Sequence, residues 1–231
     1  MRKIFSIQNI LLIGLTVVCC GAATTDKKTG PTLLLKGDSL SAWTCELDKP
    51  GVKLQDVWSL KDGVLSCKGR PNGYIITKKK DFKDYKLEFD WRWPSGKGGN
   101  SGLLLHCSKP REMGIWCKSV EVQLKSGDAG DFWAIGTDLD VENEANRKKD
   151  RRYVNLTDGT EKPIDQWNHM EVVCRGNEVV VKINNVLVNH GKNLDVRQGP
   201  IALQSEGTPI QFRNIKITPL GQAKPDVKKV K

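Results

Sequence analysis

The sequence predicts a single all-β domain of the sandwich type, on three observations. Residues 85–93 alternate aromatic or aliphatic residues with charged ones, the period-two pattern of a half-buried strand. Further short apolar runs follow along the chain, bounded by Gly, Asp, Asn and Pro, and no long amphipathic helix interrupts them. Many short strands separated by turn residues are typical of a β-sandwich. A length of 231 residues suits one such domain with a sizeable core.

The expected strands follow one another through most of the chain. In order they cover residues 58–60, 64–67, 85–93, 103–107, 120–124, 169–174, 179–183, 186–188, 201–204 and 210–217. Lys61-Asp62-Gly63 and Arg175-Gly176-Asn177 supply turns between neighbours, and Asn184-Asn185 predicts a tight hairpin. The polar stretch 138–152 has some helical bias, and we expect a long excursion over one face of the domain.

Both ends of the chain are predicted to lie outside this domain. Arg2 and Lys3, the apolar run 10–20 and the small residues Gly21-Ala22-Ala23 have the pattern of a secretory signal peptide over residues 1–23. Residues 24–32 are a polar linker, 33–220 form the domain, and 221–231 are a basic tail expected to be disordered. We therefore expect a periplasmic or secreted protein. Lipidation at Cys20 is the alternative, and it alone would attach the chain to a membrane.

The charge balance is basic, with a formal net charge of +10. Cleavage after residue 23 removes two positive charges and no negative ones, which lowers the net charge to +8. The basic residues form scattered clusters, at 78–80, 147–152 and 224–231. A nucleic-acid-binding face would combine such clusters with interleaved aromatic residues or a known motif, and the sequence has neither, so we expect no nucleic-acid partner. A hydrophobic content of 38% excludes an integral membrane protein.

Five cysteines remain beyond residue 23, and none of them forms a CxxC pair, so a zinc cluster is not expected. An oxidising compartment permits disulfides. Cys107 and Cys117 flank a short loop and are candidates to pair across it, and Cys45 with Cys67 is a second option. The odd number leaves a free thiol, for which we select Cys174 within a strand.

Seven stretches together resemble one family. They are Leu34-Leu-Lys-Gly-Asp-Ser-Leu-Ser-Ala-Trp43, Trp58-Ser-Leu-Lys-Asp-Gly63, Asn100-Ser-Gly102, Glu121-Val-Gln123, Gln166-Trp-Asn168, Gly199-Pro-Ile-Ala-Leu-Gln204 and Phe212-Arg-Asn-Ile215. In this order they resemble the DUF1080 family, the 3-keto-disaccharide hydrolase domain, over most of residues 33–220. The resemblance implies a concanavalin A-like jelly-roll sandwich and an exported role in carbohydrate turnover. One departure stands out: many members carry a histidine where this chain has Glu206.

Strand alternation predicts that polar candidate site residues lie on the face of their sheet opposite the apolar residues. Glu121 and Gln123 lie opposite the valines of their strand, and Gln204 and Glu206 lie opposite Ile201 and Leu203. The same rule places Asn100 and His106 together on one face. The candidate catalytic residues are His106, Glu121 and Glu206, and the candidate substrate-binding residues are Asn100, Gln123, Trp133, Gln204 and Arg213. Carboxylates and amides bind sugar hydroxyls and tryptophan rings stack on pyranoses, although alternating polar residues also describe an ordinary solvated face. For Arg213 the alternative is a structural arginine that orients a carboxylate.

Four other tryptophans are expected in the core, because each lies on or beside an apolar stripe: Trp58, Trp91, Trp93 and Trp167.

The family resemblance gives these residues a chemistry. A 3-keto sugar has an acidified proton on C2, which a base removes while the substituent on C1 leaves with a proton from an acid; water then adds. His106 and Glu121 are the first candidates for base and acid, with Glu206 third. Glu121 and Glu206 would instead form an ordinary glycosidase pair at about 5 to 10 Å.

Two other functions remain open on the sequence. A non-catalytic carbohydrate-binding module has the same fold, and a structural or adhesion module is a third possibility. No cofactor is firmly implied. A divalent cation is an option at Asp128 and Asp131, which lie in a Gly-rich loop without EF-hand spacing, and a plain turn is the alternative.

Overall fold

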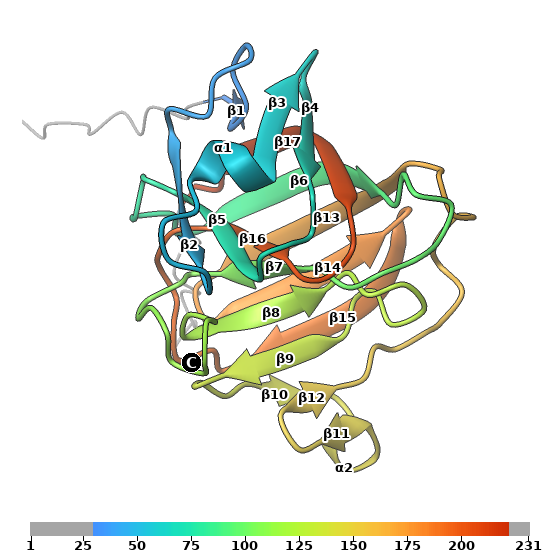
Figure 1. Ribbon diagram of the computed structural model, residues 1–231. Helices are drawn as coiled ribbons and strands as arrows, with labels where there is room; N and C mark the ends of the chain where they lie inside the picture. The colour runs from blue at the N-terminus through green and yellow to red at the C-terminus, as the bar shows by residue number, and fades with distance from the viewer. Residues whose placement is uncertain (1–29, 222–231) are drawn as a thin grey trace, which may run out of the picture.

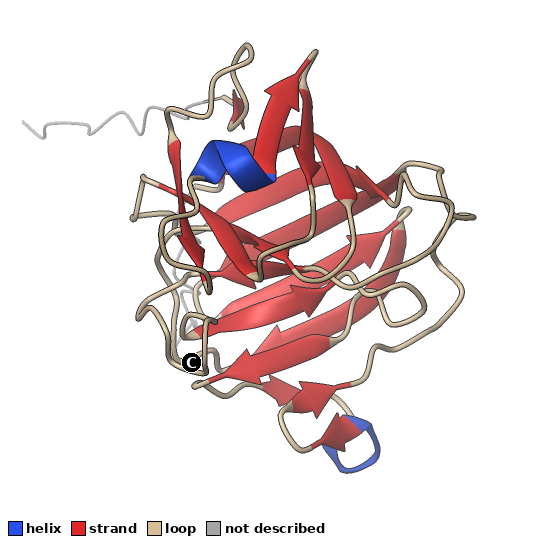
Figure 2. Cartoon of the chain, in the orientation of Figure 1, coloured by secondary structure: helices blue, strands red, loops and turns tan. Residues whose placement is uncertain are grey.

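The computed structural model describes residues 30–221, so the predicted signal peptide, most of the linker and nearly all of the basic tail lie outside the described residues. Two antiparallel sheets pack face to face, as Figure 1 and Figure 2 show. The two helices of this region, α1 (Leu54–Val57) and α2 (Glu144–Arg147), are single turns. The predicted all-β sandwich is confirmed. Neither helix is long and apolar enough to cross a membrane.

One sheet has nine strands. These are β1 (Thr32–Leu33), β3 (Trp58–Lys61), β4 (Val64–Cys67), β6 (Tyr85–Arg92), β10 (Asp140–Val141), β13 (Asn168–Arg175), β14 (Glu178–Ile183), β15 (Val186–Lys192) and β17 (Ile210–Pro219). Their order in space is β10-β15-β14-β13-β6-β17-β4-β3, with β1 paired to β17. The alternation predicted for residues 85–93 is present in β6, where every second side chain is buried.

The other sheet has eight strands. These are β2 (Trp43–Leu47), β5 (Gly73–Thr77), β7 (Gly102–Leu105), β8 (Ser119–Gln123), β9 (Phe132–Ile135), β11 (Lys148–Lys149), β12 (Arg152–Tyr153) and β16 (Ala202–Ser205). Their order is β11-β12-β9-β8-β7-β16-β5-β2. Strands β2, β5, β9, β11 and β12 were not predicted. β5 and β9 are buried on both faces for most of their length, so they lack the alternating pattern.

A continuous apolar core fills the space between the sheets. Val122 and Leu203 enter it from the eight-stranded sheet, and Phe89 and Phe212 enter it from the nine-stranded sheet. Trp58, Trp91 and Trp93 are also buried there, as predicted. A second, smaller apolar cluster lies on the outer face of the eight-stranded sheet. It consists of Tyr74, Leu104, Cys107, Cys117, Ile135 and Ala202, with Ile76 and Trp116 packed against it.

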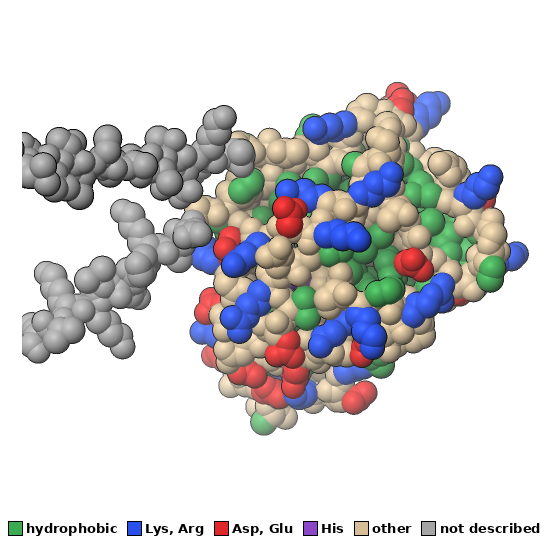
Figure 3. Space-filling view, turned by 90° about the vertical axis from the view of Figure 1, so that its left-hand side faces the viewer, with side chains coloured by type: hydrophobic (Ala, Val, Ile, Leu, Met, Phe, Trp, Pro, Cys, Tyr) green, Lys and Arg blue, Asp and Glu red, His purple; other side chains and the backbone are tan. Residues whose placement is uncertain are grey.

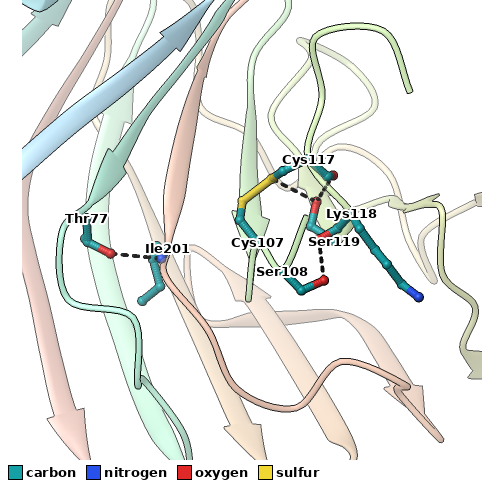
Figure 4. The surroundings of a disulfide bond; sticks show 7 residues. All are labelled: Thr77, Cys107, Ser108, Cys117, Lys118, Ser119 and Ile201. Carbon is teal, nitrogen blue, oxygen red and sulfur yellow. Dashed lines mark hydrogen bonds between the residues drawn. A yellow bond between two sulfur atoms is a disulfide. The ribbon is translucent and has the colours of Figure 1, made fainter. Parts of the chain in front are cut away.

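The loop between β7 and β8 is closed by a disulfide between Cys107 and Cys117, as predicted, with Cα atoms 5.5 Å apart (Figure 4). Because both cysteines belong to the outer apolar cluster, this loop covers part of the outer face of the eight-stranded sheet. The second option, Cys45 with Cys67, is wrong. Cys45 lies in β2 and Cys67 in β4, which belong to different sheets, and both thiols are free. Cys174 is free, as expected.

The predicted excursion over residues 138–152 is short irregular structure that links the edges of the two sheets. β10 pairs with β15 of the nine-stranded sheet, and β12 pairs with β9 of the eight-stranded sheet. The buried Arg147 fixes this segment, because its guanidinium donates to the carbonyl oxygens of Val154 and Glu142 and to Oδ1 of Asn189. The segment therefore places Arg151, which precedes β12, next to β9.

Candidate active site on the outer face of the eight-stranded sheet

Polar side chains from β8, β7 and β16 meet on the outer face of the eight-stranded sheet. Glu121 in β8 lies opposite Leu104 of β7 on one side and opposite Trp133 of β9 on the other. Gln204 projects from β16, and Glu206 follows two residues later on the same face. Asn100, just before β7, bridges to Glu206 and Gly207. The structure thus brings together four of the candidates, Asn100, Glu121, Gln204 and Glu206, with Trp133 beside them.

Gly102 forms the floor beneath this group. It occupies β7 between β8 and β16, and a Cβ atom at this position would lie closer than 3.0 Å to Oε1 of Glu121 and to Oε1 of Gln204. The two long side chains therefore lean over the glycine from opposite sides. The sequence singles out Asn100-Ser-Gly102 as a motif but gives no sign that its glycine makes this space.

Burial sets the proton affinity of Glu121, whose side chain is 6% exposed. Desolvation and the negative charge of Glu206 raise the pKa of Glu121 to about 8, against the lowering effects of a hydrogen bond from Gln204 and of the Arg151 charge. Burial also raises the pKa of Glu206, which Arg151 lowers. Because Glu206 is the less buried and acts on Glu121 as an anion, Glu206 loses its proton first. At neutral pH Glu121 remains protonated and is able to donate.

Arg151 is a site residue that the sequence analysis missed. Its guanidinium carbon lies 4.7 Å from the ring centroid of Trp133, close enough for a cation–π interaction, and its charge acts on both glutamates. The guanidinium carbon of the neighbouring Arg152 lies farther from the same centroid, at 5.9 Å, and its guanidinium is bound to Asp131 and Asp128. In the sequence both arginines belong to one basic cluster, and nothing in their spacing distinguishes the one that reaches the site.

Several polar atoms of the site are buried without a hydrogen-bond partner among residues 30–221. They are Oδ1 of Asn100, Oε1 of Gln204 and Nε1 of Trp133. Leaving such an atom unsatisfied costs about 1 to 3 kcal/mol. A ligand with several hydroxyl groups would satisfy these atoms, and the indole of Trp133 offers a partly exposed ring beside them.

His106 does not join this group, and its expected position is wrong. β7 ends at Leu105, and His106 has a left-handed backbone with φ of 56°, so the strand alternation stops there. The ring points into the space between the sheets, where it is 2% exposed. Its Nδ1 donates to the carbonyl of Val196 at 3.1 Å, and its Nε2 lies 3.0 Å from the hydroxyl of Tyr85. Burial lowers the pKa of His106, which keeps the ring neutral.

Gln123 lies opposite Gly102 but its side-chain oxygen is already engaged, and Arg213 lies outside the group. The side-chain oxygen of Gln123 accepts hydrogen bonds from the backbone N–H groups of Leu124 and Lys125, both at 2.9 Å, so it holds the turn after β8. Arg213 lies in the nine-stranded sheet, where its Nε donates to Asp90 at 3.0 Å. The position of Arg213 corrects the sequence expectation, whereas Gln123 lies in the expected strand and its role in binding stays a prediction. Arg213 does pair with a carboxylate, but its partner Asp90 lies in β6 of the same nine-stranded sheet and not at the Glu121 group.

Trp167 is a further correction, because it is not in the core. Its ring is partly exposed and is flanked by the guanidinium carbons of Arg92 and Arg213, at 4.6 and 4.2 Å from the ring centroid. The sequence pattern could not separate it from the three buried tryptophans, since it too adjoins an apolar strand.

The loop considered for a cation is held by basic side chains. Asp131 accepts from Nε of Arg152 at 2.6 Å, and Asp128 binds Arg152 at 3.0 Å and Lys125 at 2.5 Å. The carboxylates thus have cationic partners from the protein itself. Within the described part of the chain, no three His, Cys, Asp or Glu side chains are grouped closely enough to ligate a metal ion.

Solved structures with this fold include several carbohydrate-related proteins. A "putative glycosyl hydrolase" from Parabacteroides distasonis is 22% identical, covers 83% of this chain and 94% of its own, and gives a TM-score of 0.60. The carbohydrate-binding module CBM66 from Bacillus subtilis is 14% identical over 76% of this chain and 94% of its own, with a TM-score of 0.50. A legume lectin-like domain from Entamoeba histolytica is 12% identical over 78% and 91%, also with a TM-score of 0.50.

At these identities the likeness shows the fold, and it confirms the concanavalin A-like jelly roll expected from the resemblance. A comparison with curated proteins finds no match. The family profile described as "3-keto-alpha-glucoside-1,2-lyase-like domain" matches residues 30–218, which include both sheets and the polar group around Glu121. The chain belongs to this 3-keto-disaccharide hydrolase family.

Proposed function

We propose that this protein is an exported enzyme that cleaves 3-keto-glycosides, with Glu206 as the base and Glu121 as the acid. The observation that carries the proposal is the buried Glu121, whose pKa of about 8 keeps its proton at neutral pH beside a second carboxyl that ionises first. Two carboxyl groups with different proton affinities provide an acid and a base in one site. Membership of the 3-keto-disaccharide hydrolase family supports 3-keto-glycosides as the substrate class in this proposal.

The proposed reaction begins at C2 of the keto sugar. The carboxylate of Glu206 takes the C2 proton, and the electron pair forms an enolate with the C3 ketone. The ketone then re-forms as the C1–O bond breaks, which leaves a double bond between C1 and C2. The departing oxygen takes the proton of Glu121. Water adds its hydroxyl to C1, Glu206 returns its proton to C2, and Glu121 is reprotonated by that water.

The surrounding residues have matching tasks in this scheme. Arg151 provides a positive charge near both glutamates, where it would stabilise the enolate oxygen. The unpartnered amide oxygens of Asn100 and Gln204 would bind sugar hydroxyls, and the ring of Trp133 would stack on the apolar side of the pyranose. His106 has no part in the scheme, because its ring lies on the inner side of the sheet.

Product analysis with 3-keto-trehalose, 3-keto-glucosides and their unoxidised parents tests the proposal. We expect release from the keto substrates alone, and a loss of turnover of about 10²-fold or more in Glu121→Gln and Glu206→Gln. Exchange of the C2 hydrogen in D₂O separates the roles. It should persist in Glu121→Gln and disappear in Glu206→Gln. Full turnover in both variants would rule out this acid and base, and addition of EDTA tests the divalent-cation option.

A non-catalytic carbohydrate-binding module is the second candidate. The unpartnered amides of Asn100 and Gln204 beside Trp133 favour it, because such a set binds hydroxyls without requiring catalysis. It predicts measurable sugar binding without product release, and affinity unchanged in Glu121→Gln. Export is proposed from the N-terminal sequence pattern, and N-terminal sequencing of the protein recovered from its native compartment would test cleavage after residue 23.

A further inference from the structure

A hollow lies at one end of the sandwich, away from the Glu121 group. It has a volume of about 590 Å³, within the range of about 300 to 1,000 Å³ usual for small-molecule sites. Its walls come from β1, the start of β2, the segment after β5 and the end of β17. The Glu121 group projects from the outer face of the eight-stranded sheet, whereas this hollow includes Trp43 and Tyr85, which face the inner core.

The inside of this hollow is apolar. Leu33, Leu34, Trp43, Phe82 and Ile217 line it. Leu33 is 53% exposed, although it is a large aliphatic residue at a sheet edge. Trp43, Phe82 and Ile217 are 3%, 6% and 5% exposed, so the open apolar surface comes mainly from Leu33 and the partly buried Leu34. Open apolar surface in a folded domain commonly marks a binding site for an apolar ligand. The lining therefore fits a hydrocarbon chain better than a sugar.

The rim of the hollow is basic. Lys36, Lys78, Lys79 and Lys83 line it together with a single acid, Asp81. Lys79 is bound to Asp81 at 3.0 Å, and the other three lysines form no ion pair with the described residues. Figure 3 shows the side of the molecule on which β2 lies, with Lys and Arg side chains distributed around exposed hydrophobic ones. Three unpaired ammonium groups around an apolar hollow are complementary to an anionic head group on an apolar chain.

We propose that this hollow binds a single-chain anionic amphiphile, with the hydrocarbon chain against Leu33 and Leu34 and a carboxylate head between Lys78 and Lys83. The ligand class is a free long-chain carboxylate. This site is separate from the proposed glycosidase site and does not depend on its chemistry. The C-terminal segment fits less well, because the sequence beyond residue 221 is rich in lysine and would meet lysines at the rim.

Calorimetry with myristate, below its micelle concentration, tests the proposal on the whole protein. We expect one site per chain, with affinity at least tenfold weaker for neutral tetradecanol. The double change Lys78→Glu with Lys83→Glu should weaken myristate binding at least tenfold. A matched change of two exposed lysines elsewhere, Lys149→Glu with Lys192→Glu, should leave it unchanged, which controls for net charge.

Ala42→Trp fills the mouth of the hollow from an exposed position and should abolish binding while circular dichroism shows a folded protein. Glu121→Gln should bind myristate as the unmodified protein does, so a failure of the proposed glycosidase function leaves this test intact. No binding of myristate, equal loss in both lysine double variants, or binding only to anionic phospholipid vesicles would each overturn the proposal.

Discussion

Replacement of Glu121 by glutamine should remove a loss of folding stability that occurs as the pH rises. The pKa of Glu121 is about 8 in the folded protein, against 4.5 for an ordinary glutamate. Between these values the folded state holds one proton more than the unfolded state, so the free energy of unfolding falls as the pH rises. The slope is about 1.4 kcal/mol per pH unit, which amounts to about 4 kcal/mol between pH 5 and pH 8. Above pH 8 this contribution is constant.

Urea denaturation of both proteins at pH 5, 6, 7, 8 and 9 measures this effect. Other titrating groups affect both proteins alike, so the difference in unfolding free energy between Glu121→Gln and the unmodified protein isolates Glu121. We expect this difference to grow in favour of the variant by about 4 kcal/mol from pH 5 to pH 8. Glu142→Gln, at an exposed position, serves as the control and should show no such trend. A difference for Glu121→Gln that stays constant with pH would refute the reasoning.

Three further outcomes follow from particular contacts. Gly102→Ala places a methyl group where the Glu121 and Gln204 side chains lie. This variant should lower kcat/KM by about 10²-fold. The control Gly30→Ala, whose added Cβ would meet nothing within 4 Å, should leave kcat/KM unchanged. His106→Ala should lower the free energy of unfolding by about 3 kcal/mol, because Tyr85 and the Val196 carbonyl lose their partner. It should leave turnover per folded molecule intact, and a loss of turnover in a folded variant would return His106 to the mechanism. Removing the Cys107–Cys117 disulfide by a double change to alanine should cost about 3 kcal/mol, measured by thermal unfolding; a reducing agent should then destabilise only the unmodified protein.

Strand periodicity determined most of the site, because alternation is a local property. Glu121 and Gln204 fall on the outer face as the pattern predicts, since each lies in a regular strand beside residues of the opposite parity that enter the core. The same argument failed for His106, where one left-handed residue ended the strand and turned the ring to the inner side. A backbone conformation of this kind has no signal in hydrophobic alternation.

The other differences concern which hydrogen-bond or ion-pair partner a polar side chain has in the folded protein. Gln123 lies in β8, as expected, yet its side-chain oxygen is taken by the backbone of the following turn. Arg213 has the carboxylate partner that was anticipated, but in the nine-stranded sheet. Arg151 reaches the site because Arg147, four residues earlier, anchors the linking segment through hydrogen bonds to Val154, Glu142 and Asn189. Each of these outcomes depends on a contact with a neighbour that the sequence does not specify.

The sequence by itself determined the fold class, the family, and the presence of two glutamates and two amides in or beside strands that follow the family order. These properties depend on period-two patterning and on motifs that each span only a few consecutive residues. Only the tertiary structure decided that Glu121 and Glu206 share one environment, that Gly102 makes room for two side chains above it, and that His106 is a core residue. The physical reason is that pKa values and steric space depend on desolvation and on atoms from β7, β8, β9 and β16, which are distant in sequence and adjacent only in the folded sheet.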